Sequence, residues 1–265
     1  MVESPANLIH HGIGRVEVFD FAPDRLPDLR LFLSERGRPF SFHAPFTRPP
    51  GFEHPAVAVF FLSENRYRRD ESLSLVGRTV ADAKAWGAEH VVTHLNWADD
   101  TDDEKVSVRL ARESAERFSV MAREVPIHIE CGGYRGAFHD PGQFVELVSP
   151  HPGLGLCIDI GHARLISASR GRDFYKDLET MAPAARSAHL WNARDMETYR
   201  RLHHVPLHPS QRPEDGWIDI PRTLEILLSA SPECRLIFEY REDGLPPARI
   251  KEGFDWVEEL ASRVI

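Results

Sequence analysis

The sequence predicts an α/β protein that folds as a single parallel (β/α) barrel. Seven short apolar runs alternate with segments of helical pattern, which is typical of βαβ units and a parallel sheet. The length of 265 residues fits one such barrel, although two small domains would also fit. The chain has no low-complexity linker, composition shift or internal repeat. We therefore predict one domain over residues 1–265.

Each predicted strand is an apolar run that stops at a proline, a glycine or polar residues. The central run is Leu154-Gly155-Leu156-Cys157-Ile158-Asp159, in which alternation puts Cys157 and Asp159 on the face opposite Leu156 and Ile158. We expect Gly161 to turn the chain after this strand, with His162 near the strand end. The seven predicted strands are 15–21, 40–45, 90–95, 126–130, 154–159, 187–192 and 235–240.

Helical patterns connect these strands. The acidic cluster Asp99–Glu104 opens the third of them, where negative charge favours the helix macrodipole. Residues 4–11 could add a helical turn or two before the first strand, and a long loop follows residue 192. The predicted helices are 27–36, a long region ending at residue 86, 104–123, 143–148, 174–181, 220–228 and 250–263.

Composition excludes several classes of protein. Lys and Arg total 32 against 41 Asp and Glu, a net charge of -9, so the basic footprint of a nucleic-acid-binding protein is missing. The three cysteines form no CxxC pair, which argues against a disulfide framework or a thiolate zinc site. No apolar run has the length of a membrane span, and the amino terminus lacks a signal-peptide profile. We expect a cytoplasmic protein with a small-molecule substrate and no membrane partner; the charge argues against a nucleic-acid partner without forbidding one.

Imidazole and carboxylate side chains end six consecutive predicted strands. Taken singly, each has an ordinary alternative as a buried core histidine, a helix cap or an ion-pair partner. In a parallel barrel, however, the carboxyl ends of all strands open onto one face, so the six groups would converge. Three imidazoles and three carboxylates form a ligand set suited to Mn²⁺, Mg²⁺, Co²⁺ or Zn²⁺. The six residues are His43, His94, Glu130, Asp159, His189 and Glu239.

Several motifs resemble the xylose-isomerase-like TIM barrel superfamily, which contains sugar (phosphate) isomerases and epimerases and also apurinic/apyrimidinic endonucleases. The resemblance covers nearly the whole chain. It implies a TIM-type barrel with Glu130, Asp159, His189 and Glu239 as ligands of a shared divalent metal. The motifs are Cys157–His162, His189–Asn192, Leu236–Glu239 and His204–Leu207 followed by Gly216–Asp219.

The function implied by this resemblance is a metal-dependent isomerase or epimerase of a small sugar, ketose or hydroxy-keto acid. The metal would stabilise an enediolate, while Glu130 and Glu239, on strands across the barrel, would take and return the proton. His162 and His204 would contact the substrate. Arg194, in the loop after the sixth strand, is a candidate contact for an anionic or polyol end, with a solvated loop arginine as the alternative.

Two departures from the family pattern leave other functions open. Only seven of the family's eight strands are recognisable, so the barrel could be incomplete, with its edge covered by the amino-terminal segment or by a second subunit in a homo-oligomer. A non-catalytic barrel that only binds a ligand is then one alternative. The other is a multi-metal phosphodiesterase, because His43 and His94 match positions that hold a second metal in the nucleases. Leu202, however, stands where that subgroup has an aspartate.

Overall fold

A computed structural model of the chain describes residues 14–96, 101–132, 136–240 and 246–264. The predicted turn at residues 4–11 and part of the acidic cluster, residues 99 and 100, lie outside the described residues. The chain divides into two compact units, which we describe separately. The first consists of Met1–His139 and Glu146–Gly155, and the second of Asp140–Val145 and Leu156–Ile265. The single domain remains a prediction.

The described residues contain seven strands, as predicted. The strands follow one another in the sheet in chain order, and every pairing described within a unit is parallel. The α/β class with seven recognisable strands is therefore confirmed. The strands are β1 (Val16–Phe19), β2 (Phe40–His43), β3 (Val91–His94), β4 (Ile127–Glu130), β5 (Leu154–Asp159), β6 (Ala185–Leu190) and β7 (Arg235–Phe238).

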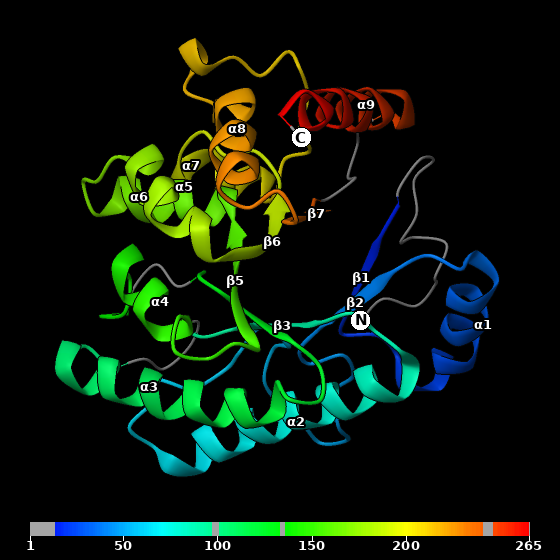
Figure 1. The fold of residues 1–265 in the computed structure, drawn as a ribbon, viewed down its shortest axis with the longest axis vertical. Helices are drawn as coiled ribbons and strands as arrows, with labels where there is room; N and C mark the ends of the chain where they lie inside the picture. The colour runs from blue at the N-terminus through cyan, green and yellow to red at the C-terminus, as the bar shows by residue number, and fades with distance from the viewer. Residues whose placement is uncertain (1–13, 97–100, 133–135, 241–245, 265) are drawn as a thin grey trace. The chain divides into compact units, whose positions relative to one another are not determined.

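Nine α-helices and three 3-10 turns lie within the described residues (Figure 1). The α-helices are α1 (Leu26–Arg36), α2 (Arg66–Trp86), α3 (Glu104–Met121), α4 (Pro141–Val148), α5 (Ile160–Ser169), α6 (Phe174–Met181), α7 (Met196–Leu202), α8 (Ile220–Ala230) and α9 (Pro247–Val264). The 3-10 turns are η2 (Pro23–Arg25), η3 (Ala182–Ala184) and η4 (Pro213–Asp215).

Asparagine and aspartate side chains begin six of these helices. Each accepts a hydrogen bond from a backbone N–H of the first turn, which satisfies a donor that has no partner within the helix. The cap of α5 is Asp159, the residue that also ends β5. One side chain therefore both ends a strand and starts the helix that follows it. The capping residues are Asn65, Asp103, Asp159, Asp173, Asp195 and Asp219.

In the first unit, long helices cover strands that are buried on both faces. Every residue of β3 and β4 is buried, as expected for parallel strands covered on both faces. Helix α2 packs against β2 and β3, α3 packs against β4, and the two helices lie side by side (Figure 1). Helix α3 buries Leu110, Ala111, Ala115 and Phe118, a spacing of three and four residues that forms one apolar face.

In the second unit, short helices follow β5 and β6, and the long helix α9 follows β7. Helix α5 packs against β6 and α6, and α8 packs against α6 and α9. The long helix α9 approaches the loop after α7 closely, because a Cβ atom at Gly253 would lie 2.0 Å from the carbonyl oxygen of Leu207. A glycine at this helix position therefore lets α9 contact the loop backbone directly.

Two helices were not predicted. The expected turn at Gly161 is wrong, because Gly161 and His162 lie in the first turn of α5. The long loop after β6 also contains the helix α7, which begins after its cap Asp195. Both helices are short and start at an aspartate, so only the cap signals them in the sequence. No helix in the described part of the chain is long and apolar enough to span a membrane.

Candidate metal centre

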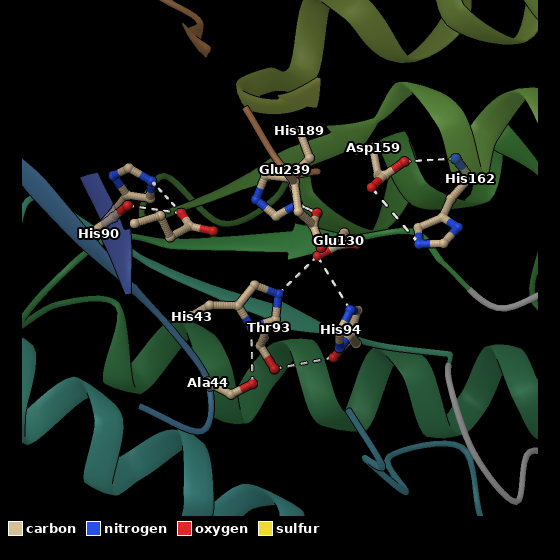
Figure 2. Close-up of polar contacts among 12 residues, drawn as sticks. His43, Ala44, His90, Thr93, His94, Glu130, Asp159, His162, His189 and Glu239 are labelled. Atoms are coloured by element: carbon tan, nitrogen blue, oxygen red, sulfur yellow. Dashed lines mark hydrogen bonds and ion pairs between the residues drawn. The ribbon is translucent and has the colours of Figure 1, made fainter. Parts of the chain in front are cut away.

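The first unit gathers His43, His94 and Glu130 at the last positions of β2, β3 and β4. The parallel register aligns His94 with Glu130 across the β3–β4 pair. His43 Nε2 lies 2.9 Å and His94 Nε2 lies 3.4 Å from the same oxygen, Glu130 Oε2 (Figure 2). All three side chains are buried. One potential ligand atom from each lies within 4.8 Å of the others, so the three could hold a metal ion.

Both ring nitrogens of His43 face acceptor oxygens. Nε2 lies 2.9 Å from Glu130 Oε2, and Nδ1 lies 3.1 Å from the carbonyl oxygen of Ala44 (Figure 2). A neutral imidazole has a single N–H, so it can donate to one of these oxygens. With Nδ1–H donated to the carbonyl, Nε2 is the potential ligand atom that faces the carboxylate. Metal-ligating histidines commonly donate their other N–H to a backbone carbonyl in this way.

In the second unit, both oxygens of Asp159 accept hydrogen bonds. Oδ1 accepts from the backbone N–H of His162 at 2.6 Å, which is the cap of α5 (Figure 2). Oδ2 accepts from the indole Nε1–H of Trp191 at 2.8 Å. The side chain of Asp159 is completely buried. Two donors on different elements therefore restrain the orientation of the carboxylate.

Glu239 lies beside two histidines one residue beyond β7. His189 Nδ1 is 2.9 Å from its Oε2, and His204 Nδ1 is 3.4 Å from its Oε1. Its backbone N–H donates to the carbonyl of Leu190, which extends the pairing of β6 and β7. The Glu239 side chain is 42% exposed, whereas those of Asp159 and His189 are buried. Glu239 can therefore exchange protons with solvent while its neighbours are shielded.

Asp159, His189 and Glu239 form a second set that could hold a metal ion. One ligand atom from each lies within 4.8 Å of the others. Two carboxylates and an imidazole suit a divalent cation such as Mn²⁺, Mg²⁺, Co²⁺ or Zn²⁺. Cys234 is outside this set, and burial raises the pKa of its thiol to about 12. The donor chemistry within this unit fits the predicted metal.

His162 and His204 lie beside this second set and contact one another. Their ring centroids are 5.2 Å apart, and Nε2 of His162 is 3.9 Å from Asp159 Oδ2. His162 thus lies near Asp159, and His204 near Glu239, in the second unit. Their role toward a substrate remains a prediction.

Arg194 has its described contacts in the exposed loop after β6. Its Nε lies 3.3 Å from Asp195 Oδ2, and its guanidinium lies over the Trp217 ring at 5.9 Å from the centroid. Neither partner belongs to the predicted site, so a substrate contact for Arg194 stays a prediction.

Sequence reasoning missed the role of Trp191. The motif His189–Asn192 draws attention through its histidine, but the indole two residues later holds Asp159. The hydrogen bond joins residues 32 apart in the sequence. A tryptophan directly after a strand that ends near a ligand was the only available signal.

Comparisons with known proteins agree with this architecture. The family model described as Xylose isomerase-like TIM barrel matches residues 6–260. A search of curated proteins found no match. Solved structures with the same fold include the IOLI protein with a bound zinc atom, with a TM-score of 0.70 and 16% identity over 96% of this chain and 90% of that one.

Two epimerases are also among the similar structures. L-ribulose 3-epimerase has a TM-score of 0.67 and 13% identity, with 96% of this chain and 86% of that one covered. The 3-keto-D-glucoside 4-epimerase YcjR from E. coli has a TM-score of 0.66 and 12% identity, with 94% and 90% covered. Identities this low show a shared fold rather than a shared activity. The match of the family model over most of the sequence shows that this chain belongs to the xylose isomerase-like TIM barrel family.

Proposed function

We propose that the protein is a divalent-metal-dependent isomerase or epimerase of a small sugar, ketose or hydroxy-keto acid. The observation that carries the proposal is the set of buried carboxylate–imidazole contacts at the ends of parallel strands in a chain of this family. The similar structures include two sugar epimerases and a zinc-bound protein, which makes this chemistry compatible with the fold.

The proposed ligands are Glu130, Asp159, His189 and Glu239. Asp159, His189 and Glu239 lie close together in the second unit. Glu130 ends β4, and the carboxyl ends of parallel strands are where active sites of this architecture lie. Burying a carboxylate without partners costs free energy. His43 and His94 contact the buried Glu130 carboxylate and can supply positive charge or a hydrogen bond to it. The four residues provide three carboxylates and one imidazole.

Proton transfer falls to the two glutamates. When bound, a divalent cation would stabilise the negative charge that develops on a substrate carbonyl oxygen as the neighbouring carbon loses its proton. Glu239 is half-exposed and contacts His189 and His204, so it can pass a proton to solvent or to an imidazole. Glu130 is buried, so a proton that it carries is shielded from solvent until it is given to the substrate. One glutamate removes the proton and the other restores it.

Histidines of the second unit are proposed to orient the substrate. His162 and His204 present imidazoles next to Asp159 and Glu239, where hydroxyl groups of a polyol could donate or accept. The substrate is accordingly a small molecule with a carbonyl beside a hydroxyl-bearing carbon.

Deuterium exchange tests this function across many candidate substrates at once. The protein is incubated with Mn²⁺ in D₂O with a panel of ketoses and hydroxy-keto acids, and NMR follows both deuterium incorporation and new epimers. We expect incorporation beside the carbonyl of at least one compound, and its loss in Glu239→Gln and Glu130→Gln. Absence of exchange across the panel with metal-loaded protein would contradict the proposal.

A second candidate function is a multi-metal phosphodiesterase. The observation that favours it is the separate set of His43, His94 and Glu130, which could hold a further metal. The net charge of -9 disfavours a DNA substrate. Cleavage of DNA containing apurinic sites by zinc-loaded protein, together with no exchange in the first assay, would replace the isomerase proposal with this one.

A further inference from the structure

Trp191 is a fully buried tryptophan immediately after β6. Trp NH groups that are buried normally need an acceptor, and here the acceptor is the carboxylate of Asp159 at 2.8 Å. This contact joins the residue after one strand to the last residue of the neighbouring strand β5. The indole therefore holds a side chain that is itself a proposed metal ligand.

The hydrogen bonds of Asp159 leave little freedom to its side chain. The cap donor, the backbone N–H of His162, occupies Oδ1, and the indole occupies Oδ2. With the cap alone, the whole carboxylate could still pivot about its bond to the cap donor. The indole restricts that motion, because each oxygen then has its own donor on a different element.

The chain makes room for this ring at Gly161. A Cβ atom built at Gly161 would lie 2.2 Å from Cε2 and 2.4 Å from Cζ2 of Trp191. Any other residue at position 161 would therefore overlap the indole. The first turn of α5 thus contacts the indole directly, between the cap Asp159 and the donor His162.

The same indole contacts the two histidines predicted to bind substrate. Its ring stacks on His204, with centroids 4.2 Å apart and planes 14° apart. His162 meets it edge-on at 5.1 Å. Since Nδ1 of His204 faces Glu239, the stack limits the positions that this imidazole can take beside Glu239. One side chain consequently restrains Asp159, His162 and His204 together.

We propose that Trp191 is a positioning residue for the candidate metal centre. Its Nε1–H orients Asp159 toward the cation, and its ring orients His204 beside Glu239. This inference rests on the proposed function, in which Asp159 is a metal ligand. Outer-shell partners of metal ligands typically contribute about 10- to 100-fold in metal affinity.

The first test is the Mn²⁺ affinity of Trp191→Phe, measured by titration of metal-free protein. Phenylalanine keeps an aromatic ring but lacks the donor, so we expect an affinity about 10- to 100-fold weaker than in the wild type. The matched control is Trp86→Phe, because Trp86 packs edge-on against Phe42 and Phe46 in the other unit. The control should bind Mn²⁺ as the wild type does. Equal affinity in Trp191→Phe and wild type would overturn the inference.

A second variant, Gly161→Ala, disturbs the same contact but keeps the indole. Gly161→Ala must displace the ring of Trp191, and we expect it to weaken Mn²⁺ binding as Trp191→Phe does. Unchanged affinity in a folded Gly161→Ala protein would count against a role for the contact.

An NMR measurement separates failure of this inference from failure of the proposed function. In metal-free protein labelled with ¹⁵N-tryptophan, the Trp191 indole signal is assigned by its loss in Trp191→Phe. We expect it to move upfield in Asp159→Ala, because a hydrogen bond to a carboxylate is lost. A signal that does not move refutes the contact itself. A signal that moves in a protein that takes up no metal refutes the proposed function and, with it, the positioning role.

Discussion

The His43–His94–Glu130 set and the Asp159–His189–Glu239 set place carboxylates beside imidazoles in two different ways. In the first set, two histidines at strand ends converge on one oxygen of one glutamate. In the second, each carboxylate has its own partners: Asp159 has a helix cap and an indole, and Glu239 has two imidazoles. The first set is rich in imidazole and the second in carboxylate.

This difference indicates which set is prepared for a cation. A metal centre needs ligands whose orientation is fixed by outer-shell donors. Asp159 receives two such donors from different elements, and its position follows from α5 and Trp191. In the first set, His43 Nδ1 contacts the carbonyl of Ala44. The second set carries two carboxylates against one in the first, and carboxylate oxygens attract a divalent cation. We infer that the second set contributes most of the metal affinity and that the first set modulates it.

The largest effect is expected from Asp159→Ala and His189→Ala. Each removes a proposed ligand, so Mn²⁺ affinity should fall by about 100-fold or more, at least as much as the loss of an outer-shell partner. Titration of metal-free protein measures this. Asp159→Asn separates metal binding from capping, because asparagine caps helices as well as aspartate does. We expect Asp159→Asn to lose metal binding and to keep the cap of α5, while its amide nitrogen cannot accept the bond from Trp191 Nε1–H. Unchanged metal content in both alanine variants would contradict the assignment of Asp159 and His189 as metal ligands.

A smaller effect is expected from His43→Ala and His94→Ala. If the first set only supports Glu130, the affinity for one equivalent of metal should fall by about 10-fold, as for an outer-shell partner. If the first set holds a second ion, the variants should instead lose a second equivalent and leave the first unchanged. Binding stoichiometry by calorimetry distinguishes these results. A loss as large as that of Asp159→Ala would reverse our ranking of the two sets.

The smallest effect is expected from Asp195→Ala. Asp195 caps α7, and hydrogen bonds from Thr198 lower the pKa of its carboxyl. Loss of the cap should cost about 1 kcal/mol of unfolding free energy and leave metal binding unchanged. Because the folded-state pKa is lowered, this stabilisation is complete above the ordinary pKa of aspartic acid and is lost as the pH falls through the lowered value. Urea unfolding of variant and wild type should therefore differ at neutral pH and converge in acid.

Most strands could be predicted from the sequence because parallel strands buried on both faces are nearly continuous apolar runs. The run Leu154–Asp159 was predicted with the bounds that β5 has. Helices α5 and α7 were missed for local reasons. In α5, the glycine and β-branched residues of Ile160–Ile166 weaken the helical pattern, and a helix cap was only the alternative interpretation of Asp159. In α7, seven residues provide too short a periodic pattern.

The ligand candidates could be predicted because residues at strand ends share one edge of a parallel sheet. The strand register, which pairs Asp159 with His189 and His94 with Glu130, follows from the same pattern. The hydrogen bonds and ring contacts that orient these ligands could not be predicted. The bond from Trp191 to Asp159 and the stack of Trp191 on His204 depend on packing between separate elements, which no local pattern records.

The central claim is that this chain holds a divalent metal through Asp159 and His189. The most direct test is elemental analysis of the purified wild-type protein after dialysis without chelator, repeated after incubation with Mn²⁺, Mg²⁺, Co²⁺ or Zn²⁺. We predict one bound equivalent of a divalent metal that is retained in Asp195→Ala and lost in Asp159→Ala. A metal-free protein that also takes up none of the added ions would contradict the account and favour a barrel that binds its ligand without catalysis.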